Sequence, residues 1–283
     1  MMMRRTIRKV TKSKPAIEGA GVHLKRGFGF SEVPLFDPFL LFDDFGSDNP
    51  ADYTKGFPWH PHRGIETITY VLNGDVEHGD SMGNKGNITS GDVQWMTAGS
   101  GIVHQEMPRG DKNGVMKGFQ LWANLPSPRK MMDPGYRDVK SKQIPELLLE
   151  NGTLIKIICG NVNGTQGPVK DIVIDPEYLD ISVPAHSTYE HPTKLGHTVF
   201  AYVISGKAYF CPEKKPFISK EELILFADGE KVFASTEDES VRFLLVSGKP
   251  IGEPVAWHGP IVMNTQEELK LAFEEYKKGT FIK

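Results

Sequence analysis

Two short pairs of metal-ligand residue types lie in one stretch of the chain. The first pair is His60 and His62, and the second is His104 and Glu106. One residue separates the members of each pair, and on a β-strand that spacing places both side chains on the same face. Two such strands, lying side by side, would aim three imidazoles and one carboxylate at a single point. This donor set suits Fe(II), Ni, Mn, Cu or Zn better than Ca or Mg.

Four protein ligands in an octahedral shell leave two coordination positions open. Adjacent open positions would let dioxygen and a substrate oxygen bind together, as in non-haem iron oxygenases. A zinc hydrolase could use the same site through a metal-bound hydroxide. Glu106 has two candidate roles, as a metal ligand and as the base that removes a proton from a substrate hydroxyl.

Three neighbouring residues compete for roles at this site. Glu66 follows His62 by four residues, and we expect it on the same alternating face, where it rivals Glu106 as the carboxylate ligand. His78 follows a tight turn and is a reserve ligand or a wall of the pocket. Arg63 either contacts a metal ligand and orients it, without itself binding the metal, or faces solvent. The remaining histidines are interpreted as ordinary surface or core residues: His23, His186, His191, His197 and His258.

Short strands separated by turn residues account for most of the chain. Residues 65–72 alternate in polarity and end at Asn73-Gly74, a tight-turn signal. Glycine (29 residues) and proline (20 residues) are both plentiful, which favours turns over long helices. The pattern predicts an all-β protein built as a sandwich or barrel. One helix is expected near the end of the chain, where Thr265 and Glu268 form a capping box.

The proline-rich stretch 126–145 marks a domain boundary, which we place between 1–137 and 138–283. The segment 70–74 (YVLNG) resembles 202–206 (YVISG), 132 residues later by subtraction of the two numbers. At that offset His60 corresponds to Pro192 and His62 to Lys194. The second half is therefore predicted to repeat the fold of the first without its metal ligands.

Composition excludes several classes of function. A hydrophobic content of 39%, a charged content of 24% and a net charge of −3 are those of an ordinary soluble protein and argue against direct binding to nucleic acid or to a membrane. Two cysteines do not make a disulfide framework. The basic start has no apolar segment behind it, so no secretory signal is expected and we predict a cytoplasmic protein, or also a nuclear one in a eukaryote.

Longer motifs give the chain a family resemblance. The segments HPHRGIETITYVLNG, GDVQWMTAGSGIVHQEMP and LFDPFLLFDDFG closely resemble the pirin family of the cupin superfamily, as do FQLWANLP, KMMDPGY, GPIVMNT and AFEEYKKGTF. The resemblance implies a bicupin, with two jelly-roll β-barrel domains, a C-terminal helix, and a metal in the first barrel alone. It further implies Fe(II), or another of Mn, Co, Ni, Cu and Zn, held by His60, His62, His104 and Glu106. Glu66 would then be a supporting hydrogen-bonding group.

The resemblance leaves three functions open. The first is a quercetin 2,3-dioxygenase, which acts on a small aromatic, flavonol-like substrate with O2 and uses Glu106 as its base. The second is a metal- or redox-dependent regulator that acts through a protein partner, as a transcriptional co-regulator or a modulator of a metabolic enzyme. The third is a small-molecule-binding cupin with an inert metal. We expect a monomer in each case.

Overall fold

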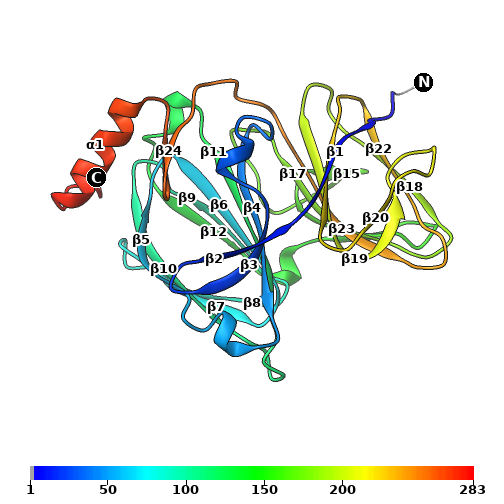
Figure 1. Cartoon of the computed structure of the whole chain (residues 1–283), viewed down its shortest axis with the longest axis horizontal. Helices are drawn as coiled ribbons and strands as arrows, with labels where there is room; N and C mark the ends of the chain where they lie inside the picture. The colour runs from blue at the N-terminus through cyan, green and yellow to red at the C-terminus, as the bar shows by residue number, and fades with distance from the viewer. Residues whose placement is uncertain (1–2) are drawn as a thin grey trace. The chain divides into compact units, whose positions relative to one another are not determined.

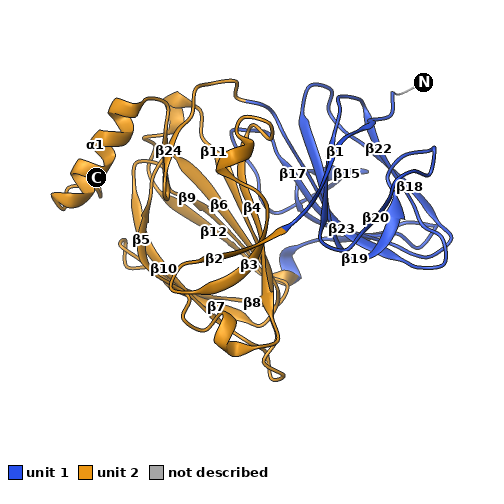
Figure 2. Ribbon diagram, viewed as in Figure 1, with its two compact units in different colours: residues 1–13, 142–250 blue, residues 14–141, 251–283 orange. Residues whose placement is uncertain are grey.

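The computed structural model describes residues 3–283, which form two compact units (Figures 1 and 2). Unit 1 contains the chain up to Ser13 together with Lys142–Pro250, and unit 2 contains Lys14–Ser141 together with Ile251–Lys283. The predicted continuous domains, 1–137 and 138–283, differ from these units at both ends of the chain. The first strand pairs within unit 1, and the last segment, which carries the helix, folds with unit 2.

Unit 2 is a barrel of two antiparallel sheets. The larger, seven-stranded sheet has the order β12 (Gly135–Val139), β9 (Val93–Thr97), β6 (Ile65–Asn73), β11 (Met116–Asn124), β4 (Phe39–Ser47), β3 (Val22–Phe28) and β2 (Lys14–Glu18). The smaller has the order β5 (Phe57–His62), β10 (Ile102–Arg109), β7 (Asp75–Asp80) and β8 (Lys85–Thr89). Strand β6 spans the alternating segment that the sequence identified, and its hydrophobic residues Ile65, Ile68, Tyr70 and Val71 are buried.

Unit 1 is built on the same plan. Its ten-stranded sheet follows the order β1 (Ile7–Lys12), β21 (Glu222–Phe226), β19 (Thr198–Tyr209), β23 (Val241–Gly248), β17 (Glu177–Val183), β14 (Leu154–Cys159) and β13 (Glu146–Leu148). Off this path lie β18 (Thr188–Pro192), β20 (Phe217–Ser219) and β22 (Lys231–Ser235), and a separate pair is formed by β15 (Asn161–Val162) and β16 (Thr165–Gln166). A continuous apolar core, which includes Leu179, Phe210 and Phe243, fills this barrel.

The internal repeat is visible in the strand order of the two larger sheets. The run β9-β6-β11-β4-β3 in unit 2 has the counterpart β21-β19-β23-β17-β14 in unit 1. Strands β6 and β19, which carry the two matching segments, hold the same position, and each segment ends at a glycine with positive φ, Gly74 and Gly206. The edge position that β12 takes in unit 2 is taken in unit 1 by β1, from the other end of the sequence. The all-β prediction is confirmed.

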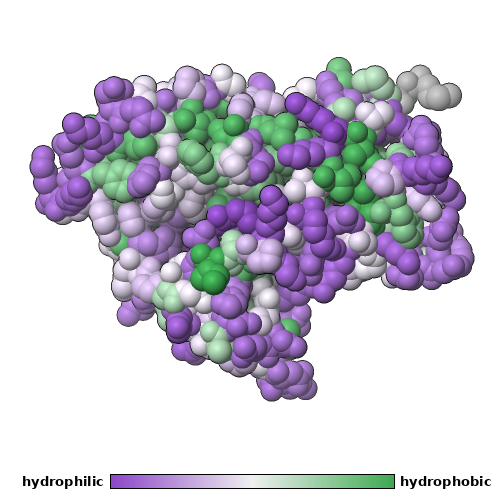
Figure 3. Space-filling model, in the orientation of Figure 1, coloured by the Kyte–Doolittle hydropathy of each residue, from purple (hydrophilic) through white to green (hydrophobic). Residues whose placement is uncertain are grey.

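The C-terminal part of unit 2 consists of the hairpin β24 (Ala256–His258) and β25 (Ile261–Met263), followed by helix α1 (Gln266–Lys277). The predicted capping box is present: the backbone N–H of Glu268 donates to Oγ1 of Thr265 at 3.1 Å, and the Thr265 N–H donates to the Glu268 carboxylate at 3.1 Å. Leu269 and Ala272 are its buried residues. On the face drawn in Figure 3, hydrophobic residues gather over β24 and β11, whereas α1 presents mainly hydrophilic ones.

The other helical elements are single 3-10 turns: η1 (Phe30–Glu32), η2 (Pro50–Asp52), η3 (Ser127–Arg129) and η4 (Ser141–Gln143). Over residues 3–283, no helix is long and apolar enough to cross a membrane.

Candidate metal centre

The two predicted ligand strands are neighbours in the four-stranded sheet of unit 2. Strands β5 and β10 run antiparallel, with His104 opposite His60 and Ile102 opposite His62. Residues opposite each other in an antiparallel pair project from the same face, and so do residues two apart along a strand. His60, His62 and His104 therefore point into the barrel together, as the spacing predicted.

The three imidazoles form a tight group. The ring centroids lie 4.8 Å apart for His60 and His62, 4.4 Å for His60 and His104, and 5.0 Å for His62 and His104. One ring nitrogen from each residue lies within 4.8 Å of the other two. Among the His, Cys, Asp and Glu residues of the described chain, this is the one such group with metal-binding geometry.

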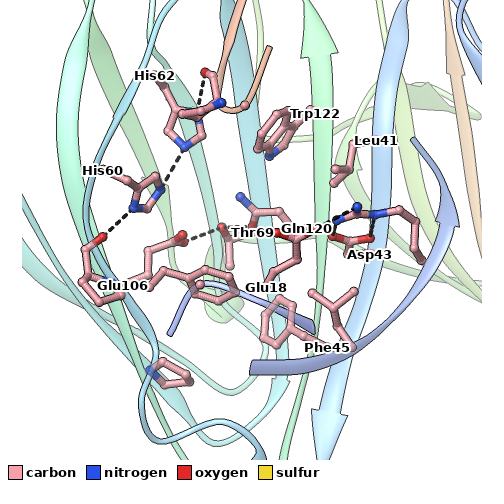
Figure 4. Close-up of a pocket in the computed structure, with 18 of the residues that line it drawn as sticks. Glu18, Leu41, Asp43, Phe45, His60, His62, Thr69, Glu106, Gln120 and Trp122 are labelled. Carbon is pink, nitrogen blue, oxygen red and sulfur yellow. Dashed lines mark hydrogen bonds and ion pairs between the residues drawn. The ribbon is translucent and has the colours of Figure 1, made fainter. Parts of the chain in front are cut away.

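Hydrogen bonds fix the proton positions on two of these rings. Nδ1 of His60 lies 2.8 Å from the carbonyl oxygen of Pro58, and Nδ1 of His62 lies 3.1 Å from that of Pro260. A carbonyl oxygen only accepts, so each Nδ1 carries the proton. In the neutral rings both Nε2 atoms are then acceptors, yet they face each other at 3.0 Å (Figure 4). The two lone pairs repel each other at this distance. A metal cation bound to both nitrogens would make the same arrangement favourable.

His104 supplies the third nitrogen without a competing partner. The residue is buried, and neither of its ring nitrogens has a hydrogen-bond partner. Burial lowers the pKa of His104 well below its ordinary value, and the nearby His62 and His60 lower it further. Burial likewise holds the pKa of His62 well below its usual range. Three neutral imidazoles, each offering the lone pair of one ring nitrogen, fit a divalent transition metal. Imidazole is a suitable ligand for Fe, Ni, Cu and Zn alike.

Glu106 shares the face of β10 with His104 but lies outside the histidine group. Its buried carboxylate accepts a hydrogen bond from the Thr69 hydroxyl at 3.3 Å (Figure 4). Thr69 also lies 2.6 Å from Oε1 of Gln120. Burial raises the pKa of Glu106 to about 7, against which the Thr69 bond acts weakly. A rotation of the side chain away from Thr69 would be required for ligation, so its place among the ligands stays a prediction.

Glu66 lies elsewhere. It accepts a 2.7 Å hydrogen bond from Thr97, and it is on the opposite face of β6 from Thr69. The expectation that Glu66 shares a face with His62 is wrong, because the chain passes from one sheet to the other between β5 and β6. Gly64, with φ of 78°, makes that change of direction.

His78 lies directly opposite Glu106 in the β10–β7 pair but is not part of the histidine group. Its Nε2 lies 2.8 Å from the Gln94 amide nitrogen, and its ring stacks on Tyr136 at 5.6 Å. It is therefore a buried neighbour of Glu106 on the barrel wall.

Arg63 is buried, with 2% of its surface exposed, and does not face solvent. Its Nε donates to the Ser100 carbonyl at 2.6 Å, Nη1 to Glu275 at 2.6 Å, and Nη2 to the Phe281 carbonyl at 2.8 Å. The guanidinium also lies over the Phe281 ring, 4.2 Å from its centroid. One side chain thus ties the end of β5 to the turn before β10 and to the C-terminal segment.

Lys130 makes a second link of this kind. Its Nζ donates to the carbonyl oxygens of Gly64 (2.9 Å) and Val262 (3.0 Å) and to the Asn124 side chain (2.7 Å). Together with Pro260, these contacts make the C-terminal segment a structural part of the histidine site. No local pattern in the sequence marks Lys130, Pro260 or Phe281 for this role.

A cavity of about 680 Å³ opens beside the histidines. His60, His62 and Glu106 form part of its wall, and Thr69 and Gln120 continue it across the barrel (Figure 4). Most of the remaining wall is apolar or aromatic, contributed by Leu24, Phe30, Leu41, Phe45, Phe57, Trp59, Val76, Trp122 and Trp257. The candidate metal site therefore adjoins a space sized for a small aromatic molecule.

Comparisons with known proteins agree with this description. The Pirin family model matches residues 21–123, and the model of the Pirin C-terminal cupin domain matches residues 178–282. The chain is 42% identical to a pirin-like protein of Caulobacter vibrioides, over 98% of this chain and 99% of that one. It is 41% identical to pirin-like protein 2 of Arabidopsis thaliana, over 93% of this chain and 81% of that one.

Among solved structures, a quercetin 2,3-dioxygenase from Acinetobacter baumannii is similar over 98% of both chains, with 29% identity and a TM-score of 0.89. The first matched region lies in unit 2, whereas the second covers much of unit 1 and continues into the C-terminal segment of unit 2. The chain therefore belongs to the pirin family and is a bicupin.

Proposed function

We propose that this protein is a metal-dependent dioxygenase that opens the central ring of a flavonol such as quercetin. The observation that carries the proposal is the aromatic cavity whose wall includes His60, His62 and Glu106. A flat substrate in this cavity would place its polar edge at the histidines and its rings against Phe57, Trp122 and neighbouring side chains. The likeness to the Acinetobacter baumannii enzyme supports the same reaction class.

We assign His60, His62, His104 and Glu106 as the ligands of the metal, with Fe(II) as the expected ion. When bound, a divalent metal would act as a Lewis acid that polarises the substrate oxygens. The protein supplies the rest. The Nδ1 bonds to Pro58 and Pro260 hold two rings with Nε2 toward the centre.

We assign Glu106 as the base that acts on the substrate hydroxyl. Its carboxylate lines the cavity and would accept the proton of the flavonol 3-hydroxyl. When the carboxylate is turned away from the histidines, the Thr69 hydroxyl donates a hydrogen bond to it. The aromatic walls exclude water from the resulting anion. In the overall reaction two carbon–carbon bonds of the central ring break, and C3 leaves as carbon monoxide with the former hydroxyl oxygen. Both atoms of O2 enter the ester product, so no further oxidant or reductant is needed.

The test is an anaerobic titration followed by admission of air. Protein loaded with Fe(II), Mn, Co, Ni or Cu is mixed with quercetin, and the flavonol absorption band should shift on binding. Air should then bleach the band with release of one equivalent of carbon monoxide. His104→Ala should abolish both the metal and the bleaching, whereas His23→Ala, which alters an exposed histidine of the same unit, should leave both intact. Absence of bleaching with every metal would refute the proposal.

A further inference from the structure

A polar row crosses the cavity wall on the side away from the histidines. Arg26 of β3 lies opposite Asp43 of β4, Asp43 lies opposite Gln120 of β11, and Gln120 lies opposite Thr69 of β6. Residues directly opposite in an antiparallel sheet share a face, so these four side chains project into the barrel as one row. Gln120 and Thr69 lie between the histidines and Asp43 (Figure 4).

Arg26 and Asp43 close the far end of the row. The guanidinium donates from Nε and Nη2 to the two oxygens of Asp43, at 2.9 Å and 2.8 Å, and Nη1 contacts Glu18 at 2.9 Å. Asp43 is 4% exposed, and all three residues form part of the cavity wall. A carboxylate has room for about four hydrogen bonds, and Arg26 occupies one position on each oxygen of Asp43. Each carboxylate oxygen of Asp43 therefore has room for one more hydrogen-bond donor.

The charges of Arg26, Asp43 and Glu18 favour some ligand groups at this end of the cavity over others. Among the described residues that line the cavity, Arg26 is the one lysine or arginine, and it is shared between two carboxylates. The local excess is negative, so an anionic group on a ligand would be repelled and a hydroxyl donor would be attracted. The amide of Gln120 faces the same space, with its oxygen turned to the Thr69 hydroxyl and its nitrogen toward the histidine side (Figure 4).

We propose that Asp43, held by Arg26, and Gln120 form a second binding subsite that selects an uncharged aromatic substrate with a hydroxyl on the ring remote from the histidines. The row joins the histidine end of the cavity to a second polar end at Asp43, and aromatic side chains form other parts of the wall, which fits a flat molecule with oxygen at both ends. The inference deepens the proposed function, on which its choice of a flavonol skeleton rests. It adds a selection by charge and by hydroxyl position that the histidine site does not provide.

The test compares four probes on the metal-free wild-type protein. Binding is followed by quenching of tryptophan fluorescence, because Trp59, Trp122 and Trp257 line the cavity. The probes are 3-hydroxyflavone, the same compound with a hydroxyl added at C7 or at C4′, and its 4′-carboxylate. We expect one of the hydroxylated probes to bind about 10-fold more tightly than 3-hydroxyflavone, and the carboxylate about 10-fold more weakly. Equal affinities for all four would overturn the proposal.

A variant pair assigns the selection to Asp43. Asp43→Asn should remove most of the hydroxyl gain and improve binding of the carboxylate, because Arg26 loses a compensating charge. Asp44→Asn, on the opposite face of the same strand and outside the cavity wall, should retain the wild-type order. Retention of the hydroxyl gain in folded Asp43→Asn would overturn the role of Asp43, and if that variant does not fold, the wild-type series decides.

The outcome is separable from that of the proposed function. Hydroxyl selection without bleaching of quercetin would uphold the subsite and refute the dioxygenase. Bleaching without hydroxyl selection would do the reverse.

Discussion

The carbonyl oxygen of Pro260 lies 3.1 Å from Nδ1 of His62, across 198 residues of sequence. This bond sets the tautomer of a candidate ligand from a segment that the chain reaches only after completing the second barrel. It shows that the C-terminal segment is part of the candidate metal centre. Arg63, which contacts both Ser100 and Phe281, ties the same segment to both ligand strands.

Arg63→Met should weaken metal binding without altering a ligand. The substitution leaves the Ser100 and Phe281 carbonyl oxygens without their donor and removes one of the two cationic partners of Glu275, so we expect the free energy of unfolding to fall by about 3 kcal/mol. Looser ligand strands should lower the affinity for Ni(II) by 10- to 100-fold, on the order seen for supporting groups of metal sites. Urea unfolding and competition with a chelator measure the two effects.

The control for Arg63→Met is Arg109→Met, which alters an exposed arginine at the end of β10. Arg109→Met should leave both the free energy of unfolding and the affinity for Ni(II) close to those of wild type. Wild-type Ni(II) affinity in folded Arg63→Met would contradict a positioning role.

His104→Leu should have opposite effects on the metal-free and metal-bound proteins. Without metal, two buried ring nitrogens lack partners, and each unsatisfied group costs about 1–3 kcal/mol, so the variant should be at least as stable as wild type. With Ni(II) at about 100 times its Kd, wild type should gain about 2.7 kcal/mol and the variant nothing. Thermal unfolding with and without metal gives both comparisons. A metal-induced gain equal in both proteins would argue against His104 as a ligand.

Glu106→Gln and Glu66→Gln separate the two candidate carboxylates. Both side chains are buried and both substitutions preserve shape. If Glu106 is the ligand, its replacement should lower metal affinity about 10-fold or more, because the amide cannot supply the negative charge. Glu66→Gln should leave the affinity nearly unchanged, since Glu66 bonds to Thr97 on the other face of β6. Chelator competition measures both, and the reverse order would exchange the assignments.

The stability of unit 2 should rise between about pH 8 and pH 10.5. Burial lowers the pKa of Lys130 from its ordinary 10.5 to about 8, against the opposing influence of Glu253 and Glu268. Within that window the unfolded chain binds the proton and the folded chain does not, so raising the pH favours the folded state. The full effect is on the order of 3 kcal/mol, and below pH 8 the penalty of the buried charge is constant.

Urea unfolding across this pH range measures the Lys130 effect by the difference between wild type and Lys130→Met. The variant should lack this rise with pH, whereas Lys112→Met, at an exposed lysine, should retain it. Parallel pH profiles for wild type and Lys130→Met would contradict the assignment.

Local pattern determined a large part of this protein. The alternation of β-strands placed His60 with His62, and His104 with Glu106, and the capping box located the helix after Thr265. The match between 70–74 and 202–206 identified the repeated barrel. Each of these features can be recognised in a short window of sequence, because the spacing of residue types within that window is enough to identify it.

Tertiary structure decided which distant segments meet. Pairing of β5 with β10 brought the histidines together, and the change of sheets at Gly64 removed Glu66 from them. The exchange of terminal segments placed Pro260 and Phe281 behind the site and β1 in the other barrel. The rotamer of Glu106 and the row from Arg26 to Thr69 likewise depend on register between strands. Long-range pairing is set by the summed packing of whole faces, and no short window of sequence records that sum.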